Sequence, residues 1–218
     1  MAGREAIDAP YHPPVATGGA RRRAPLTLRP AEFDAACADL MRMVECDFAP
    51  DLLVGVRTGG YIVAEAMARA AARSIPVLPL TCRRPTTRFK SLIPGLKPIL
   101  ARLPRPLLDR LRQAEHQLLA GRRRQARLPP VDRHEAAAIG EWVTRSPRMT
   151  RMLVVDDAVD SGGTLATVLK TLPRVCPPGA QPRTAVITVT TENPAVEPDY
   201  ALYRGVLCRF PWSFDAAD

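Results

Sequence analysis

One segment of the chain combines carboxylates, hydroxyls and glycines in a pattern suited to binding a phosphorylated ligand. It reads MLVVDDAVDSGGTL over residues 152–165. The apolar residues predict a buried strand, and two carboxylates follow at its C-terminal end, where open α/β sheets bind ligands. The glycine- and hydroxyl-rich turn then opens a helix, so backbone N–H groups and the helix dipole would face an anion. Carboxylates beside a phosphate site are expected where the ligand also carries vicinal hydroxyls or a Mg²⁺ ion.

The spacing of this segment differs from two common nucleotide-binding motifs. It lacks the Gly-Lys-Ser/Thr of a Walker A loop and the G-x-G-x-x-G of a dinucleotide fingerprint. It closely resembles the motif with which type I phosphoribosyltransferases bind 5-phosphoribosyl-1-pyrophosphate (PRPP). That motif is an apolar strand, two acidic residues and a short turn ending in Thr/Ser-Gly-x-Thr. The structural alternative is a capped strand-to-helix turn, which does not need two adjacent carboxylates.

The resemblance implies an enzyme that transfers phosphoribosyl from PRPP to an acceptor and releases pyrophosphate, with Mg²⁺ as its cofactor. The sugar passes through an oxocarbenium-like state, so the charge that develops on pyrophosphate must be met electrostatically. Asp156 and Asp157 would hold the ribose hydroxyls, directly or through Mg²⁺-bound water. The loop 158–164 would bind the 5-phosphate through Ala158, Val159, Ser161, Gly162, Gly163 and Thr164.

A second segment, VGVRTGG at residues 54–60, ends an earlier apolar run. It is similar to the short loop that binds pyrophosphate in the same family. Arg57 would offer a charge-assisted hydrogen-bonding fork, and the amides of Thr58, Gly59 and Gly60 would hold phosphate oxygens. Residues 81–130 separate this segment from the main motif, so the two lie further apart than in compact family members.

The C-terminal segment CRFPWSFD, residues 208–215, is similar to the hood over the base in the xanthine–guanine–hypoxanthine branch of the family. Phe210 and Trp212 would then bind the acceptor, with Trp212 stacked on its ring. The alternative is that Trp212 closes the hydrophobic core. Purine enzymes usually place a Lys after the strand that precedes the hood, whereas this chain reads TTENP at residues 190–194. The acceptor is therefore expected to be a purine-like base or the hydroxyl of a sugar or specialised metabolite.

Asp160 also favours that branch, because its members tend to carry Asp at this place, near the purine imidazole edge. There the Asp160 carboxylate could accept or relay a proton as a catalytic group. The alternative role is to cap the turn at Gly162 and Gly163.

Strands and helices alternate along the chain and would position these motifs. Helical spacing of apolar residues predicts helices at 31–46, 61–73, 133–145 and 164–172. Short apolar runs predict strands at 51–56, 76–80, 151–155, 184–190 and 201–207. This alternation implies an α/β fold with a mostly parallel twisted sheet flanked by helices, as in type I phosphoribosyltransferases, with a small C-terminal hood. Residues 1–30 are expected to form a disordered or loosely attached arm, and 31–218 the phosphoribosyltransferase-like domain.

The positive charge is concentrated in one segment. Residues 81–130 hold thirteen basic and two acidic side chains, a net charge of +11, whereas the whole 218-residue chain carries +9 and the remainder −2. The family keeps a mobile loop where residues 81–92 lie, so Arg83 and Arg84 are candidates to reach the pyrophosphate. Residues 107–120 have an apolar helical face. The whole segment is interpreted as a basic lid and helical insertion that could pack on the body, form a homodimer, or contact nucleic acid or an anionic membrane surface.

Composition restricts the compartment and the function classes. Hydrophobic residues make up 46% of the chain, the mean hydropathy is −0.09, and no apolar stretch reaches the ~18 residues of a spanning helix. Five scattered cysteines without a CxxC pair favour a reducing cytoplasm, and no secretory signal is visible. A cytoplasmic protein is expected, with peripheral membrane attachment left open.

Two further functions stay open: a PRPP-sensing regulator that binds nucleic acid through the insertion, and an enzyme acting on a lipid-linked acceptor at the membrane surface.

Overall fold

A computed structural model describes residues 25–82, 130–146 and 151–213, in which five strands form one parallel sheet in the order β3-β2-β4-β5-β6. Every neighbouring pair in this sheet is parallel. The strands are β2 (Leu52–Arg57), β3 (Val77–Thr81), β4 (Arg151–Val159), β5 (Gln181–Val189) and β6 (Tyr200–Arg204). The predicted α/β class with a mostly parallel sheet is therefore confirmed.

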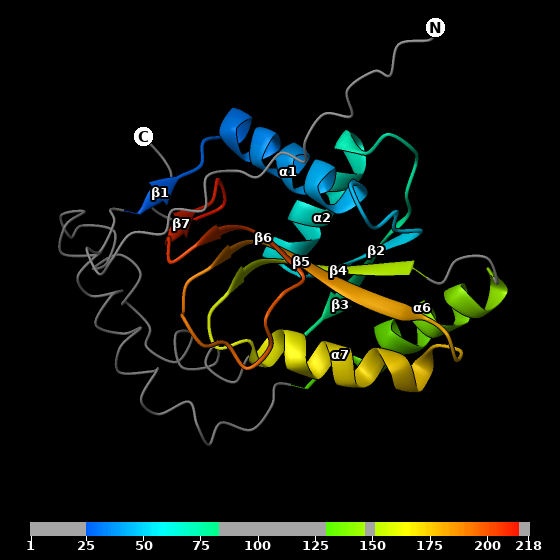
Figure 1. Ribbon diagram of the computed structural model, residues 1–218. Coiled ribbons are helices and arrows are strands. Elements are labelled where there is room, and N and C mark those ends of the chain that lie inside the picture. Colours follow the sequence, from blue (N-terminus) through cyan, green and yellow to red (C-terminus); the bar gives the residue numbers. More distant parts are fainter. Residues whose placement is uncertain (1–24, 83–129, 147–150, 214–218) are drawn as a thin grey trace, which may run out of the picture.

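Helices cover both faces of this sheet (Figure 1). The helices α1 (Pro30–Glu45) and α2 (Gly59–Ala70) pack on one face, and α6 (Arg133–Arg145) and α7 (Gly163–Val175) pack on the other. Side chains alternate between the faces along each strand. Leu53 and Val155 accordingly belong to the core beneath α1 and α2, whereas Val54 and Val154 belong to the core beneath α6 and α7. These four side chains are fully buried.

The first helix shows how local sequence fixes an element's start. Pro30 stands at the first helical position, where its fixed φ suits the helix and its missing N–H costs nothing. The Glu32 carboxylate accepts a hydrogen bond from the Arg29 backbone N at 2.8 Å. Apolar side chains at helical spacing then face the core. They are Phe33, Ala36, Cys37, Leu40, Met41 and Val44.

β4 is longer than the predicted strand at 151–155. It pairs with β5 as far as Val159, opposite Val189. Asp156 and Asp157 therefore lie within the strand and not after its end. Aspartate is depleted in strands, so the apolar pattern predicts an end at Val155. Pairing with β5 carries the strand past the carboxylates.

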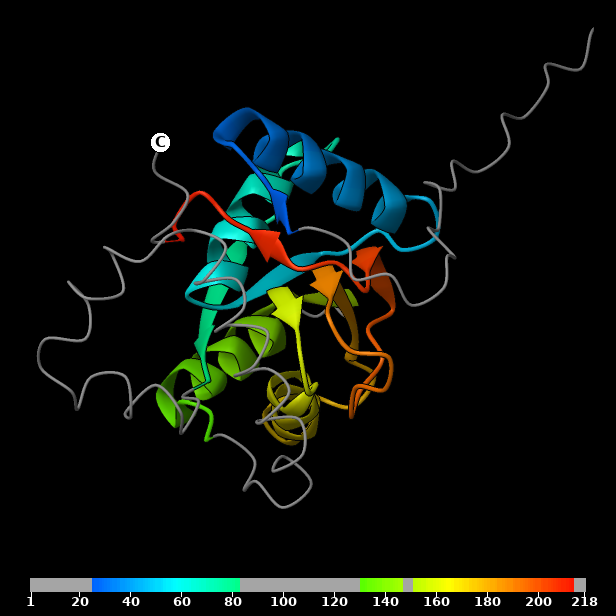
Figure 2. The ribbon, with the colours of Figure 1, turned by 90° about the vertical axis from the view of Figure 1, so that its left-hand side faces the viewer.

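A two-stranded parallel sheet lies beside α1, toward the edge at which the main strands end (Figures 1 and 2). It consists of β1 (Leu26–Thr27) and β7 (Cys208–Arg209), with Leu26 opposite Cys208. Leu28 follows β1 and is buried in the core. The predicted arm at 1–30 is therefore wrong for residues 25–30, which belong to the folded domain. A strand of two residues has no periodicity for a sequence to display. Residues 1–24 of that arm lie outside the described residues.

An ion-pair cluster holds the opposite edge, where the strands begin. Asp51 precedes β2 and accepts hydrogen bonds from Arg151 Nε at 3.2 Å and Arg151 Nη2 at 3.0 Å. Arg73 Nη2 lies 3.0 Å from the same carboxylate. Burial of Asp51 would raise its pKa, but the hydrogen bonds and charge of Arg151 and a hydrogen bond from Arg73 outweigh burial and hold the pKa below its ordinary value. The cluster joins the starts of β2 and β4.

The residues that flank the basic segment pair with each other and form a short stem. Cys82 and Val131 form an antiparallel bridge, and the Asp132 backbone N donates to Thr81 O at 2.9 Å. The segment 83–129 lies outside the described residues, and with it Arg83, Arg84 and the predicted helix at 107–120. In the part of the chain that the structure describes, every helix is too short or too polar to cross a bilayer.

Candidate active site

The two motifs predicted to bind ligand meet at the edge where the parallel strands end. β2 and β4 are neighbours in register, with Leu53 opposite Leu153 and Gly55 opposite Val155. Figure 2 views the sheet from this edge, with β2 and β4 side by side. The chain therefore brings the loop after β2 against the carboxylates of β4, although the basic segment separates them in sequence.

The glycine pair after β2 packs directly on the aspartate pair of β4. A Cβ on Gly59 would lie 2.0 Å from Asp157 Oδ2, and one on Gly60 would lie 2.6 Å from Asp156 Cα and 2.5 Å from Val155 O. Real Cβ atoms essentially never come within 3.0 Å of a non-bonded heavy atom, so a side chain at either position would force a neighbouring group to shift. At Gly60 the β4 backbone approaches too closely for any side chain, whereas at Gly59 the space is filled by the movable end of the Asp157 side chain.

The two carboxylates differ in burial and in hydrogen bonding. Asp156 is 3% exposed, and its Oδ1 accepts from the Asp157 backbone N at 3.0 Å. Asp157 is half-buried, and its Oδ1 accepts from the Ala158 backbone N at 2.9 Å. Asp157 Oδ2 is the oxygen that faces Gly59. Asp157 is therefore the more accessible of the two predicted catalytic carboxylates.

The turn after β4 is shaped by Gly162, which caps α7 in the left-handed conformation with φ +73°. A Cβ there would lie 2.8 Å from Val196 N and 2.9 Å from Ala195 N. The Ala195 N donates to Ser161 O at 2.8 Å, so the turn is held against the segment after β5. Ser161 is exposed and Thr164 is buried, and these are the predicted hydroxyl donors of the loop.

The helix N-termini at this edge differ in capping. The N-terminus of α6 is capped by Asp132, whose Oδ1 accepts from the His134 and Glu135 backbone N atoms at 3.0 and 3.1 Å. The N-cap residues of α2 and α7, Thr58 and Gly162, make no side-chain capping hydrogen bond, and neither helix carries an acidic residue in its first turn. At α7 the Gly163 backbone N donates to Ser161 Oγ at 3.5 Å. The dipoles at the N-termini of α2 and α7 therefore suit an anion, and the binding of phosphate groups by the two glycine-rich motifs stays a prediction.

Arg57, the last residue of β2, is held between two partners. Its Nε lies 3.6 Å from Glu135 Oε1, and its guanidinium carbon lies 5.6 Å from the centre of the Tyr61 ring. The peptide bond between Arg57 and Thr58 is cis. Neither Glu135 nor Tyr61 is among the site residues predicted from the sequence. Tyr61 follows the glycine pair directly, whereas Glu135 lies beyond the basic segment, where no local spacing connects it to Arg57.

Asp160 is joined to the end of β5. The Thr190 hydroxyl donates to Asp160 Oδ1, and the Thr190 backbone N donates to Val159 O at 2.9 Å. Thr190 belongs to the segment in which the purine enzymes would carry a Lys. An acceptor contact of Asp160 stays a prediction.

The aromatic residues predicted to bind the acceptor pack against each other and against α1. Phe210 is 5% exposed and stacks on Trp212, with ring centres 4.9 Å apart and planes at 3°. Trp212 also meets Phe33 edge to face, with ring centres 5.2 Å apart. Trp212 is half-buried against the core, which matches the packing alternative for this side chain. Its use in acceptor binding stays a prediction, and for Phe210 burial leaves little surface for a ligand.

Asp156 and Asp157 are the residues predicted to hold a magnesium ion. Among the described residues, no three His, Cys, Asp or Glu side chains gather closely enough to hold a metal ion. Mg²⁺ is commonly bound by one or two carboxylates together with substrate phosphates and water. The donor set fits a magnesium ion that shares its ligands with a phosphorylated substrate and does not fit an all-protein site.

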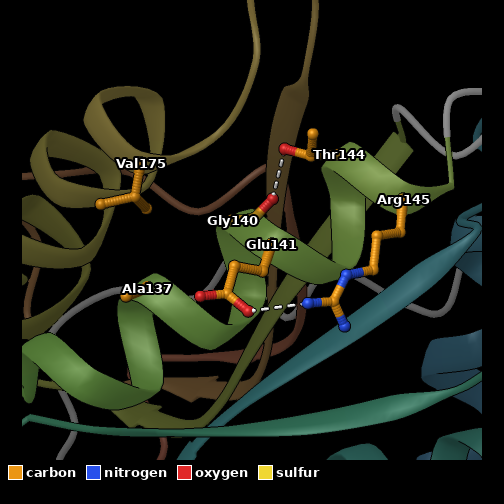
Figure 3. A pocket seen from close by; sticks show the side chains of 6 residues that line it. All are labelled: Ala137, Gly140, Glu141, Thr144, Arg145 and Val175. Carbon is orange, nitrogen blue, oxygen red and sulfur yellow. Dashed lines mark hydrogen bonds and ion pairs between the residues drawn. The ribbon is translucent and has the colours of Figure 1, made fainter.

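A shallow pocket lies away from this edge, between α6 and α7 (Figure 3). Its lining residues are Ala137, Gly140, Glu141, Thr144, Arg145 and Val175. Thr144 Oγ1 donates to Gly140 O at 2.8 Å, and Arg145 Nη2 pairs with Glu141 Oε2 at 3.2 Å. Val175 is the last residue of α7, whereas the glycine turn lies before the first. The pocket therefore does not belong to the candidate active site.

Comparison with solved structures gives the same fold at low identity. A purine phosphoribosyltransferase from Pyrococcus horikoshii matches with a TM-score of 0.50 and 17% identity over 86% of this chain and 93% of that one. A Helicobacter pylori xanthine-guanine-hypoxanthine phosphoribosyltransferase matches with a TM-score of 0.50 and 18% identity over 87% and 94%. A hypothetical protein from Neisseria gonorrhoeae with bound ppGpp matches with a TM-score of 0.50 and 14% identity over 89% and 93%.

No protein-family model matches the sequence, and no curated protein is significantly similar to it. The structural likenesses therefore carry the comparison alone. They show that the chain has the fold of the type I phosphoribosyltransferases, as the motif at residues 152–165 predicts.

Proposed function

We propose that this protein is a phosphoribosyltransferase that transfers the 5-phosphoribosyl group from PRPP to an acceptor and releases pyrophosphate. The packing of Gly59 and Gly60 on Asp157 and Asp156 carries the proposal. It joins a loop suited to pyrophosphate with a motif suited to ribose 5-phosphate, and PRPP contains both groups. The fold shared with two purine phosphoribosyltransferases supports the same class of reaction.

Each part of PRPP has a candidate partner at this edge. The 5-phosphate would bind the first-turn amides of α7 with the Ser161 hydroxyl, at a helix end that carries no acidic residue. The pyrophosphate would bind the amides of Thr58 to Gly60 and the guanidinium of Arg57. Asp157, the more accessible carboxylate, would accept hydrogen bonds from the ribose hydroxyls, and Asp156 would support it from beneath through the hydrogen bond to its backbone N.

Asp156 and Asp157 would also hold Mg²⁺, directly or through water, as expected for a donor set of two carboxylates. A bound magnesium ion would supply positive charge to offset that of the pyrophosphate. Arg57 and the backbone amides of the loop after β2 would offset the same negative charge. These groups act most strongly on the leaving oxygen, where negative charge grows as its bond to C1 breaks.

The acceptor supplies the electron pair for the new bond to C1 and loses a proton. Asp160, held by Thr190, is the candidate to accept or relay that proton. The two phosphoribosyltransferases of the same fold, named for purines, support a purine-like base as acceptor. The absence of a Lys from residues 190–194 supports a hydroxyl of a sugar or specialised metabolite instead.

Release of pyrophosphate from PRPP, measured across a panel of purine bases and sugar or metabolite hydroxyls, tests the proposal. We expect one acceptor class to give magnesium-dependent release that is lost in Asp157→Asn, while the melting temperature of that variant stays close to the parent's. Release that survives both Asp156→Asn and Asp157→Asn would overturn it.

A second candidate function is a regulator that senses PRPP or a related phosphorylated nucleotide and binds nucleic acid through residues 81–130. The net charge of +11 in that segment supports it, and a protein of the same fold holds ppGpp. The absence of pyrophosphate release with any acceptor, together with tight and salt-sensitive binding of RNA or DNA, would favour the regulator over the enzyme.

A further inference from the structure

Glu135 links Arg57 to the backbone at the end of the neighbouring strand. Arg57 and Thr81 are paired residues at the ends of β2 and β3. One oxygen of Glu135 lies 3.6 Å from Arg57 Nε, and the other accepts a hydrogen bond from the Thr81 backbone N. One carboxylate therefore spans the last residues of two strands.

Glu135 is itself fixed by its place in α6. Its backbone N donates to Asp132 Oδ1 at 3.1 Å, and the Asp132 backbone N donates to Thr81 O at 2.9 Å. The start of α6 and the end of β3 thus form a closed set of hydrogen bonds. Within it, the Glu135 side chain is 27% exposed, whereas that of Arg57 is 51% exposed.

An ion pair of this kind contributes little to folding, because half-exposed charges are well solvated and long side chains lose rotamer entropy when they pair. Its effect on a ligand is larger, because an arginine already held in place loses less freedom when an anion binds. Glu135 contacts Nε, the guanidinium nitrogen nearest the backbone. The Tyr61 ring lies beside the same group, with its centre 5.6 Å from the guanidinium carbon. Within the described residues, Glu135 is the ion-pair partner of Arg57, and it does not engage the two terminal nitrogens through this contact.

We propose that Glu135 is a positioning residue that orders the Arg57 guanidinium for the pyrophosphate group of the ligand. This inference rests on the proposed function. Glu135 touches neither substrate nor reacting atoms, and it acts through Arg57. The start of α6, which follows the basic segment in sequence, would therefore be part of the pyrophosphate-binding site.

A double-mutant cycle on the full chain tests this role, with magnesium pyrophosphate as the probe and calorimetry as the readout. Glu135→Gln keeps an oxygen for the Thr81 N–H but removes the charge that holds Arg57. We expect Glu135→Gln to raise the Kd for magnesium pyrophosphate about three- to fivefold, the scale of a partly exposed ion pair. Arg57→Ala should raise it about tenfold or more, because it removes a charge-assisted fork. In the Arg57→Ala background, adding Glu135→Gln should have no further effect.

Glu141→Gln is the matched control. Glu141 lies on the same helix and pairs with Arg145 at 3.2 Å, but it lines the pocket remote from this edge. The Kd of this variant should equal the parent's. With PRPP as substrate, Glu135→Gln should raise the KM for PRPP and leave the KM for the acceptor unchanged.

The outcomes separate the inference from the proposed function. The positioning role is overturned if Glu135→Gln leaves the Kd for magnesium pyrophosphate unchanged, or raises it equally with and without Arg57. In either case, pyrophosphate binding by the parent protein would still support the proposed function. A parent protein that binds neither magnesium pyrophosphate nor PRPP overturns the proposed function and the inference together.

Discussion

The carboxylate of Asp157 occupies the space that a side chain at Gly59 would need, since a Cβ on Gly59 would lie 2.0 Å from Asp157 Oδ2. Gly59 opens α2 after β2, and Asp157 lies in the neighbouring strand β4. The contact couples the two loops that are proposed to hold opposite ends of one ligand. A change in either residue should therefore be felt at both.

Gly59→Ala is expected to impair ligand binding more than folding. The methyl group must displace the Asp157 side chain, whose oxygens are its flexible end, so we expect a loss of about 1 kcal/mol in the free energy of unfolding. Turnover should fall about 100-fold, because a displacement near 1 Å at a binding group can cost that much. Denaturant unfolding and pyrophosphate release measure the two effects.

Gly163→Ala is the control for folding in this comparison. A Cβ there would find only Ser161 Oγ, at 3.6 Å, which is ordinary contact. We expect its unfolding free energy to match or exceed the parent's, since alanine is favoured over glycine in a helix. A Gly59→Ala protein with parental turnover would show that the close packing of the two loops is not needed.

The two aspartates should respond differently to neutralisation. In Asp157→Asn the more accessible carboxylate loses its charge, and we expect turnover to fall about 100- to 1000-fold with little change in stability. In Asp156→Asn the change falls on a buried side chain, so a loss of about 1–2 kcal/mol in unfolding free energy should accompany the loss of turnover. Equal stability of the two variants would contradict the assigned difference in burial.

The strand–turn–helix at residues 152–165 could be recognised from the sequence because its chemistry is local. The carboxylates, glycines and hydroxyls all lie within nine consecutive residues, 156–164. The structure places Gly162 at φ +73°, where glycine is favoured. The order of the main strands and helices is equally readable, because the helices show apolar residues at helical spacing and the buried strands are short apolar runs.

Three features, two of the site and one of the fold, could not be read from local sequence. Glu135 reaches Arg57 only through the fold, and a glutamate in the first turn of a helix is ordinary. Phe210 and Trp212 lie in a segment without periodicity, so an aromatic side chain there is equally compatible with core packing and with a ligand. The strand β1 has two residues, too few for any pattern. Each of these features depends on contacts between segments distant in sequence.

Stability should fall in acid because of Asp51. The pKa of Asp51 is lowered from its ordinary 3.8, since the hydrogen bonds and charge of Arg151 and a hydrogen bond from Arg73 outweigh burial. The unfolded chain therefore binds the proton more readily, so this contribution is fully present above pH 3.8 and is lost as the pH falls through the folded pKa. We expect Asp51→Asn to flatten the acid limb of a stability–pH curve and to lower the unfolding free energy at pH 7 by about 1–3 kcal/mol.

Asp39→Asn is the matched control for the acid limb. Asp39 pairs with Arg42 one turn away on the surface of α1, with 33% of its side chain exposed. Its removal should change the unfolding free energy by no more than about 0.5 kcal/mol. An acid limb unchanged by Asp51→Asn would mean that other carboxylates carry the pH dependence.

Trp212 should contribute to folding through Phe33. The two rings meet edge to face at 5.2 Å, and the pair joins the C-terminal segment to α1. A double-mutant cycle of Phe33→Leu and Trp212→Leu should give a coupling of about 0.5–1.5 kcal/mol in unfolding free energy. Zero coupling would show that the ring contact does not attach the C-terminal segment, and a rise in acceptor KM for Trp212→Phe would add acceptor binding to its role.

The stem at Cys82 and Val131 predicts that the basic segment can be removed without loss of the fold. Residues paired across antiparallel strands lie about 5 Å apart, a gap that a two- to four-residue turn can close. Replacing residues 83–129 with an Asn-Gly turn should leave the melting temperature within a few degrees of the parent's, because the Thr81 contacts to Asp132 and Glu135 stay intact. The replacement removes all thirteen basic residues of the segment and leaves a body with a net charge of −2.

We expect the full chain to bind anionic vesicles or RNA in a manner weakened by salt, and the shortened chain to bind neither. Equal binding by both chains would mean that the segment does not contact polyanions, and a shortened chain that fails to fold would show that the stem needs the segment it closes.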